Sequence, residues 1–309
     1  MVKNAKLSIS LLLAFLIGLI LALQIWYLPD QQLAQPSSDL SADPTPPDIN
    51  VADLVREIHP HGGVTLPVVY GDIGPQLIQV GAIHLDAFTA AYEQAGQPLT
   101  PEQLEILQSG SNEAIVIDQE NAYFLLNLFW ALGLTNQNVI LTDGQMMDAG
   151  ASQVGRFAST GGWTLGNLDP TDLFASQALV ALTADQHNLV EIAANLVYRP
   201  CCINHTGFPD CNHGMAMLGF LELMAAQDAS LEEMLVAAKY INAYWFSSQA
   251  YDLALFFKAA DGLNFSEVPT REAMSVDYFS SYGYAQVRNW LASRSLLQEN
   301  LGDGSGCGV

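Results

Sequence analysis

A dense group of sulfur and imidazole side chains marks the segment CCINHTGFPDCNHGMAML, residues 201–218. Five such side chains lie within 13 residues, although the chain of 309 residues holds only 4 Cys and 6 His. Thiolates and imidazoles are the ligands that suit zinc, copper and iron. The segment therefore predicts a transition-metal site, zinc or copper ahead of iron, with the candidate ligands Cys201, Cys202, His205, Cys211 and His213.

The elements that would position these ligands are two helices joined by a loop. Pro200 is expected to end the first helix, because proline cannot continue helical hydrogen bonding. Asp210 is expected to cap the second helix, which runs from about Asn212 to Gln227. The loop between them brings one pair of ligands to the start of the second helix, where the other pair lies. The four-ligand set favoured by this geometry is Cys202, His205, Cys211 and His213, with Cys201 as a spare.

Two other kinds of chemistry fit the same residues. Cys211 at a helix N-terminus, beside His213 and near Arg199, is expected to have a lowered pKa, which suits the nucleophile of a thiol-based redox enzyme. Exported thiols also tend to oxidise, so a disulfide could staple the loop of a structural or partner-binding module. In that case the remaining thiol would pair with Cys307. Taken alone, Arg199 is interpreted as a solvated side chain.

The apolar N-terminal segment predicts a membrane anchor. Residues 7–28 carry no charge and are long enough to cross a bilayer as a helix, which takes about 20 apolar residues. Lys3 and Lys6 precede this segment and Asp30 follows it, so the positive-inside rule places the N-terminus in the cytoplasm. The bilayer is thus a predicted partner through residues 7–28, and the main domain is expected to be periplasmic or extracellular. A cleaved signal peptide is the alternative, and it also exports the domain.

The rest of the chain divides by composition into a spacer, a domain and a tail. Residues 29–47 are rich in Pro, Ser, Gln and Asp, which predicts a disordered linker. Residues 48–300 contain no second linker of this kind and are predicted to form one domain. The glycine-rich residues 301–309 predict a flexible tail.

Helical signals dominate the predicted domain. Capping boxes begin at Thr100, Thr183 and Ser230. We expect helices at 53–58, 87–94, 101–110, 121–134, 184–198, 212–227 and 231–245. The β-like runs 114–117 and 139–141 leave room for one tiny β-hairpin. The predicted fold class is therefore all-α, preceded by the transmembrane helix.

The charge balance excludes one class of partner. The chain holds 32 Asp and Glu against 10 Lys and Arg, a net charge of −22. Such a surface repels nucleic acid, so we predict no nucleic-acid partner. No protein partner, organic cofactor or substrate is indicated by any motif. The leading hypothesis is thus a membrane-anchored, extracytoplasmic metal-binding domain with a structural or redox role.

Overall fold

The computed structural model describes residues 49–148 and 150–297. The predicted anchor at residues 7–28, the linker at 29–47, the tail at 301–309 and Cys307 lie outside these ranges. Within them, no helix combines the length and the apolar character needed to cross a bilayer. The described residues belong to a unit that begins at Asp48.

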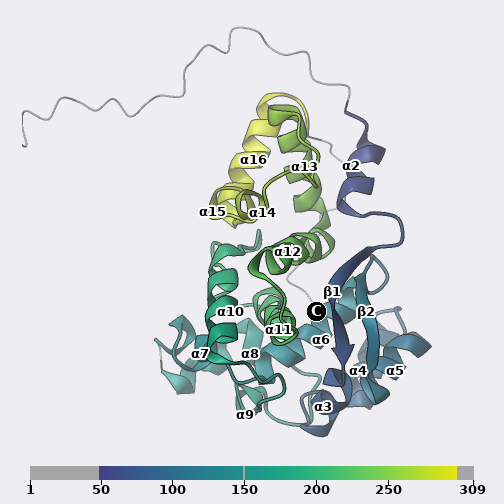
Figure 1. The fold of residues 1–309 in the computed structure, drawn as a ribbon, viewed down its shortest axis with the longest axis vertical. Helices are drawn as coiled ribbons and strands as arrows, with labels where there is room; N and C mark the ends of the chain where they lie inside the picture. Colours follow the sequence, from purple (N-terminus) through teal and green to yellow (C-terminus); the bar gives the residue numbers. More distant parts are fainter. Residues whose placement is uncertain (1–48, 149, 298–309) are drawn as a thin grey trace, which may run out of the picture. The chain divides into compact units, whose positions relative to one another are not determined.

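The described chain is mostly helical, with a single small sheet in the part that the structure describes (Figure 1). This arrangement supports the all-α prediction for the domain. The elements, in chain order, are α2 (Val51–Ile58), β1 (Val64–Gly71), α3 (Ile73–Gln79), α4 (Leu85–Gln94), α5 (Pro101–Ser109), β2 (Ser111–Ile117), α6 (Ala122–Thr135), α7 (Val139–Thr142), the 3₁₀ turns η1 (Gln145–Met147) and η2 (Ala151–Arg156), α8 (Ala158–Gly161), α9 (Pro170–Leu173), α10 (Ala184–Leu196), α11 (Asn212–Ala226), α12 (Leu231–Trp245), α13 (Ser247–Asp261), α14 (Thr270–Ala273), α15 (Val276–Phe279) and α16 (Ser281–Ser293).

Local capping signals fix the starts of three helices. The side chains of Thr100, Thr183 and Ser230 each accept a hydrogen bond from the backbone N–H three residues later, and each capping box is complete. These interactions satisfy backbone donors that a helix start otherwise leaves unpaired. The three helices therefore begin where the sequence predicted.

Helices α6 and α11 pack against each other at the centre of the larger hydrophobic core. Their backbones meet at two glycines: a Cβ on Gly133 would collide with the carbonyl oxygen of Met215, and one on Gly219 with that of Phe129. Nearly every residue of both helices is buried. The all-round apolar sequence of 121–134 thus corresponds to a core helix, as predicted.

Replacing Gly219 with alanine is expected to lower the free energy of unfolding by about 1–3 kcal/mol, because the added methyl must push two helix backbones apart. Gly155→Ala is the control, since its methyl would meet only one side-chain methyl, on Thr171, at 2.9 Å. Denaturant unfolding of the full-length chain measures both changes. Equal stability of Gly219→Ala and the wild type would contradict the close helix approach.

The sheet consists of β1 and β2 in antiparallel pairing, from Val64 opposite Ile117 to Gly71 opposite Ser111. The β-like run 114–117 lies within β2, whereas β1 was not predicted, and the second β-like run, 139–141, forms the helical turn α7. On the free edge of β1, the Gln227 side chain accepts a hydrogen bond from Val69 N and donates one to Val69 O, both at 2.9 Å. Edge groups are thereby satisfied without a third strand.

A second hydrophobic core joins α2, α13, α15 and α16 to the end of α12. Lys239 of α12 reaches into it, with its side chain almost fully buried at 2% exposure. Its Nζ donates hydrogen bonds to the carbonyl oxygens of Phe265 (3.0 Å) and Val268 (3.2 Å). This lysine fastens the segment after α13 onto α12.

Candidate functional site: a thiol cluster on a buried arginine

The loop that carries the predicted ligands is tied to its surroundings by backbone hydrogen bonds. Helix α10 ends at Leu196, and the chain then runs extended, with Tyr198 bridged to His205. Thr206 N donates to Val197 O at 2.9 Å. At the other side, Ser281 N of α16 donates to Cys202 O at 2.8 Å. The loop is thus fixed between α10 and the start of α16. Pro200 was expected to end the helix, but α10 ends four residues earlier, at Leu196.

Three sulfur atoms gather at this loop. The Sγ atom of Cys201 lies 3.9 Å from Cys202 Sγ and 3.9 Å from Cys211 Sγ. All three are free thiols, with Cys201 exposed and the other two partly exposed. The three cysteines that are clustered in sequence thus lie in contact.

Arg199 lies beneath the sulfurs with 0% exposure, contrary to the expectation of a solvated side chain. Its Nη2 donates to Asp210 Oδ1 at 2.8 Å, to Phe208 O at 3.2 Å and to Cys202 Sγ at 3.4 Å. Its Nε and Nη1 have no hydrogen-bond partner among the described residues. A buried guanidinium of this kind retains its charge, so a strong positive charge faces the thiols.

Gly214 in the first turn of α11 makes room for the guanidinium. A Cβ at this position would lie 2.6 Å from both Cζ and Nη1 of Arg199. Cys211 is the N-cap residue of α11, and Asp210, predicted as the cap, instead pairs with Arg199. The amides at the start of α11 and the guanidinium therefore face the same sulfur cluster.

The electrostatics of the cluster separate the three thiols. Hydrogen bonds from Cys201 and Cys211, with the charge of Arg199, hold the pKa of Cys202 well below its usual range despite burial. The pKa of Cys201 is raised, first because it donates to Cys202. For Cys211, the hydrogen bond with Cys201 lowers the pKa, but the one with Cys202 and burial outweigh it, so the net pKa is raised. The arrangement fits one thiolate on Cys202, which is stabilised by hydrogen bonds from two thiols and a guanidinium.

Burial and charge also affect Arg199 and its carboxylate partner. Burial alone lowers the pKa of Arg199, but the neighbouring sulfurs and Asp210 outweigh this effect and raise it. Burial raises the pKa of Asp210 more than the guanidinium lowers it. The 2.8 Å ion pair nevertheless has the geometry of a charge-assisted hydrogen bond.

The two histidines do not join the sulfurs. His213 is buried, its Nδ1 lies 3.0 Å from Asn212 Oδ1, and its ring packs on Phe246 with centroids 4.5 Å apart. Burial, followed by the Arg199 charge, lowers its pKa to about 4. The His205 ring packs edge-on against Tyr198 at 5.6 Å. Both imidazoles are therefore committed to aromatic packing.

The predicted metal site is wrong. In residues 49–148 and 150–297, no group of three or more His, Cys, Asp or Glu side chains is placed to hold a metal ion. The imidazole ligands are directed elsewhere, and the cation beside the sulfurs is the guanidinium of Arg199. The predicted ligands that this finding overturns are Cys201, Cys202, His205, Cys211 and His213.

The expected lowering of the Cys211 pKa is wrong. Cys211 does stand at a helix start near Arg199, but its pKa is raised, and Cys202 makes the direct contact with the guanidinium. The loop-stapling disulfide is absent from the described cysteines, which are free. The burial of Arg199 was not predicted because it depends on contacts with Gly214 and Asp210, which are not adjacent to it in sequence. The one sequence feature that pointed to this role was a basic residue near three cysteines in a chain with few Lys and Arg residues.

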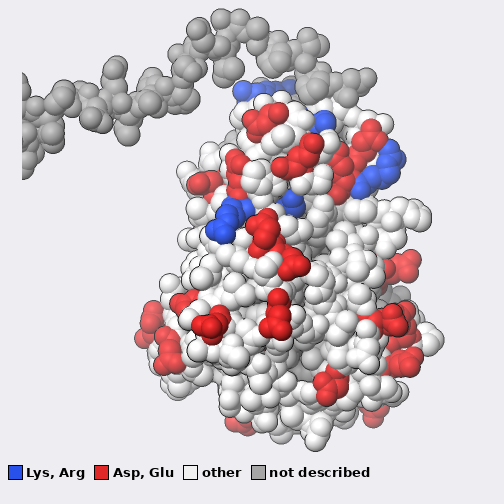
Figure 2. Space-filling model, viewed as in Figure 1, with Lys and Arg blue, Asp and Glu red and all other residues white. Residues whose placement is uncertain are grey.

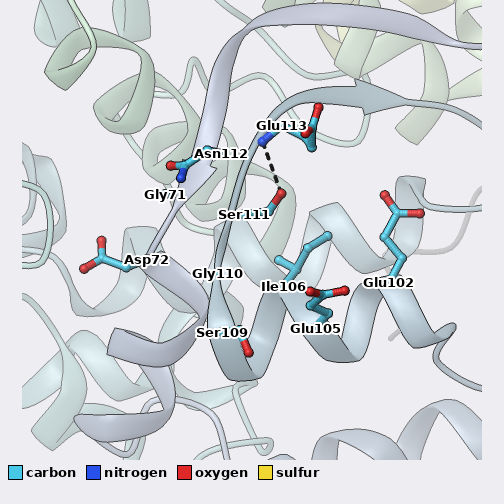
Figure 3. Close-up of a pocket in the computed structure, with 10 residues that line it drawn as sticks. All are labelled: Gly71, Asp72, Glu102, Glu105, Ile106, Ser109, Gly110, Ser111, Asn112 and Glu113. Atoms are coloured by element: carbon cyan, nitrogen blue, oxygen red, sulfur yellow. Dashed lines mark hydrogen bonds between the residues drawn. The ribbon is translucent and has the colours of Figure 1, made fainter.

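A pocket of about 770 Å³ lies elsewhere, between α5 and the ends of β1 and β2 (Figure 3). Its carboxylates come from α5, from β2 and from the residue between β1 and α3, and in Figure 3 they point in different directions rather than toward one centre. The hydrogen bond within it joins Glu113 N to Ser111 Oγ at 3.2 Å. The pocket therefore offers no convergent set of ligands. Its acidic members are Asp72, Glu102, Glu105 and Glu113.

A smaller pocket of about 300 Å³ places His59 beside Ser247. Ser247 Oγ lies 3.4 Å from His59 Nε2, but that nitrogen is also 2.9 Å from Ala243 O, which can only accept a hydrogen bond. His59 Nε2 therefore carries its proton toward the carbonyl. An imidazole in this state cannot take a proton from the serine through the same nitrogen, so the pair is no hydrolytic dyad.

Acidic side chains are scattered over the visible face, most of which carries no charged residue (Figure 2). On the face shown, basic side chains occur in the upper part of the view, while the lower part shows only acidic ones. This distribution agrees with the net charge of −22.

Comparison of the chain with protein-family models, with characterised proteins and with solved structures gives no match.

Proposed function

We propose that this protein exchanges thiols and disulfides at the cluster, with the Cys202 thiolate as the attacking group. The observation that supports this most strongly is the 3.4 Å contact from the fully buried Arg199 Nη2 to Cys202 Sγ. A fixed cation at this distance stabilises a thiolate, and the thiolate is the species that attacks a disulfide. A second thiol lies 3.9 Å away to complete the exchange.

The proposed reaction balances within thiol and disulfide chemistry. The Cys202 sulfur attacks one sulfur of a substrate disulfide, the substrate S–S bond breaks, and the departing thiolate takes a proton from solvent. A neighbouring thiol of the cluster then loses its proton and attacks the Cys202 sulfur, which releases the second half of the substrate as a thiol. The substrate disulfide is reduced to two thiols while two protein thiols are oxidised. The reverse reaction oxidises a dithiol substrate.

Access to the sulfurs supports this proposal. The Cys201 thiol is exposed, and Cys202 is only partly covered, so a substrate disulfide can approach from solvent. Reactive cysteines are typically partly exposed in an electropositive environment, whereas inert ones are buried in apolar surroundings. The predicted export would place the cluster where disulfides persist.

The test uses the full-length chain carrying Cys307→Ser, with 2,2′-dipyridyl disulfide at pH 6. The protein is expected to release the thiopyridone chromophore from this reagent at least about tenfold faster than N-acetylcysteine does, because the thiolate is already present at this pH. Adding Cys202→Ser should abolish the fast phase. Equal rates with and without Cys202 would refute the proposal. So would a cluster that is purified as a disulfide and stays oxidised in excess dithiothreitol, since that is the behaviour of a structural staple.

A further inference from the structure

We infer that the oxidised cluster is a Cys201–Cys211 disulfide beside a surviving Cys202 thiolate. This inference rests on the proposed exchange at Cys202 and specifies its product. After Cys202 has taken up half of the substrate, the disulfide moves to the other two sulfurs, and the thiolate on Arg199 is regenerated. Three disulfides are possible among three neighbouring thiols, and the structure separates them by backbone geometry and by charge.

Backbone geometry disfavours a stable Cys201–Cys202 disulfide. Adjacent Cα atoms lie about 3.8 Å apart across a trans peptide, whereas disulfides usually join Cα atoms about 4.4–6.8 Å apart. A bridge between neighbours must therefore distort the peptide or the S–S geometry, and such a strained bond is more easily broken. The vicinal pair serves at most as a short-lived intermediate.

Charge disfavours a Cys202–Cys211 disulfide. Arg199 is 0% exposed and donates to Cys202 Sγ, while its Nε and Nη1 have no partner among the residues described. A disulfide on Cys202 would remove the negative charge at this contact and leave the guanidinium with Asp210 alone as its counter-ion. Removing one partner from a buried charge pair is strongly unfavourable.

The remaining pair, Cys201 and Cys211, meets neither obstacle. Their sulfurs are already 3.9 Å apart, and the residues are ten positions apart in sequence, at opposite ends of the loop. Their oxidation leaves Cys202 free to keep its contact with Arg199. Transfer is balanced: the Cys211 or Cys201 thiolate attacks the oxidised neighbour, one S–S bond forms, one breaks, and the leaving sulfur is Cys202. The oxidised site therefore retains a nucleophile, and its disulfide is exposed to reductant at Cys201.

The experiment oxidises the full-length Cys307→Ser protein with limiting 2,2′-dipyridyl disulfide, alkylates it at pH 5 and locates the disulfide by tandem mass spectrometry. The expected product is Cys201–Cys211 over Cys202–Cys211 by at least about tenfold, with Cys202 alkylated. A disulfide that maps to Cys202, or an oxidised protein without a thiol that alkylates at pH 5, would overturn the inference.

Two variants provide an independent readout. Cys201→Ser forces the disulfide onto Cys202. In a dithiothreitol redox buffer, the disulfide of this variant should therefore be reduced at a dithiol-to-disulfide ratio at least about tenfold lower than the disulfide of the parent protein. Cys202→Ser should match or exceed the parent in resistance to reduction. Equal midpoints for Cys201→Ser and its parent would contradict the role of Arg199.

Failure of the proposed function can be told apart from failure of this inference. Diamide oxidises thiol pairs without requiring Cys202 to react first. If the protein reacts with the pyridyl disulfide no faster than N-acetylcysteine does, the proposed exchange function is refuted. A Cys201–Cys211 product with diamide would still support the location of the disulfide, and a Cys202–Cys211 product would refute it.

Discussion

Replacing Arg199 with methionine is expected to make the alkylation of Cys202 steeply dependent on pH. In the wild type, the rate with iodoacetamide should change by less than about threefold between pH 5 and pH 8, because Cys202 is ionised throughout this range. In Arg199→Met, the rate should rise by more than about 30-fold over the same interval, as for an ordinary thiol. Site-resolved mass spectrometry at low conversion measures the rate at Cys202.

The physical reason is the source of the positive charge. Hydrogen bonds among the three sulfurs decide which of them is ionised, and Cys201 donates to Cys202. These bonds share one negative charge but cannot neutralise it. The guanidinium at 3.4 Å supplies the opposite charge in a buried position, where electrostatic interactions are stronger than in water.

Two further variants keep this prediction testable if Arg199→Met is unstable. Gly214→Ala retains the arginine but places a methyl within 2.6 Å of its Cζ, so it should displace the guanidinium and raise the pKa of Cys202. Arg271→Met removes an exposed arginine of α14 and serves as the control. A flat pH profile in Gly214→Ala and Arg199→Met alike would show that the arginine does not stabilise the thiolate.

Glu222→Gln is expected to remove a large pH dependence of stability. Glu222 lies in α11 with 0% exposure, and Asn138 Nδ2 donates to its Oε1 at 2.5 Å. Burial raises its pKa to about 8, from an ordinary value of 4.5. The folded protein thus keeps this carboxyl protonated where the unfolded chain would ionise it.

The sign follows from this difference. The contribution of the protonated carboxyl is complete below pH 4.5 and is lost as the pH rises toward 8. Relative to Glu222→Gln, the wild type should therefore lose roughly 3–5 kcal/mol of unfolding free energy between pH 4.5 and pH 8. Urea unfolding at several pH values measures the difference, and parallel curves for the two proteins would contradict it.

Glu233→Gln provides a control of opposite sign. Hydrogen bonds from the Ser230 side chain and backbone lower the pKa of Glu233, so its contribution is present above the ordinary pKa and is lost as the pH falls. Relative to Glu233→Gln, the wild type should therefore lose no stability as the pH rises from 5 to 8. A shared decline in both comparisons would point to a global effect of pH rather than to Glu222.

Sequence patterns predicted the elements whose signals are local. The capping boxes at Thr100, Thr183 and Ser230 act within three residues, so they identify helix starts without knowledge of the fold. Strand β1 was missed because Pro67 interrupts its sequence, and proline disfavours a central strand. The structure accommodates Pro67 on an exposed position of a two-stranded sheet, between the irregular pairs at Thr65 and Val69.

The candidate site could be located from sequence, but its chemistry could not. The cysteines that are clustered in sequence are also in contact in the structure. The directions of the His213 and Arg199 side chains depend on tertiary contacts. His213 packs on Phe246, which lies 33 positions away, and Arg199 occupies the space left by Gly214. Similarly, Glu222 is the single charged residue of α11 and Lys239 the single basic residue of α12, and only packing shows that both are buried.

The most direct test of the account is the ultraviolet absorbance of thiolate in the full-length Cys307→Ser protein as a function of pH. One thiolate per chain should already be present at pH 5, and Cys202→Ser should remove it, because a charged sulfur at position 202 is held by the Arg199 guanidinium. A cluster that shows no thiolate absorbance until the pH exceeds about 8, where ordinary cysteines ionise, would contradict it.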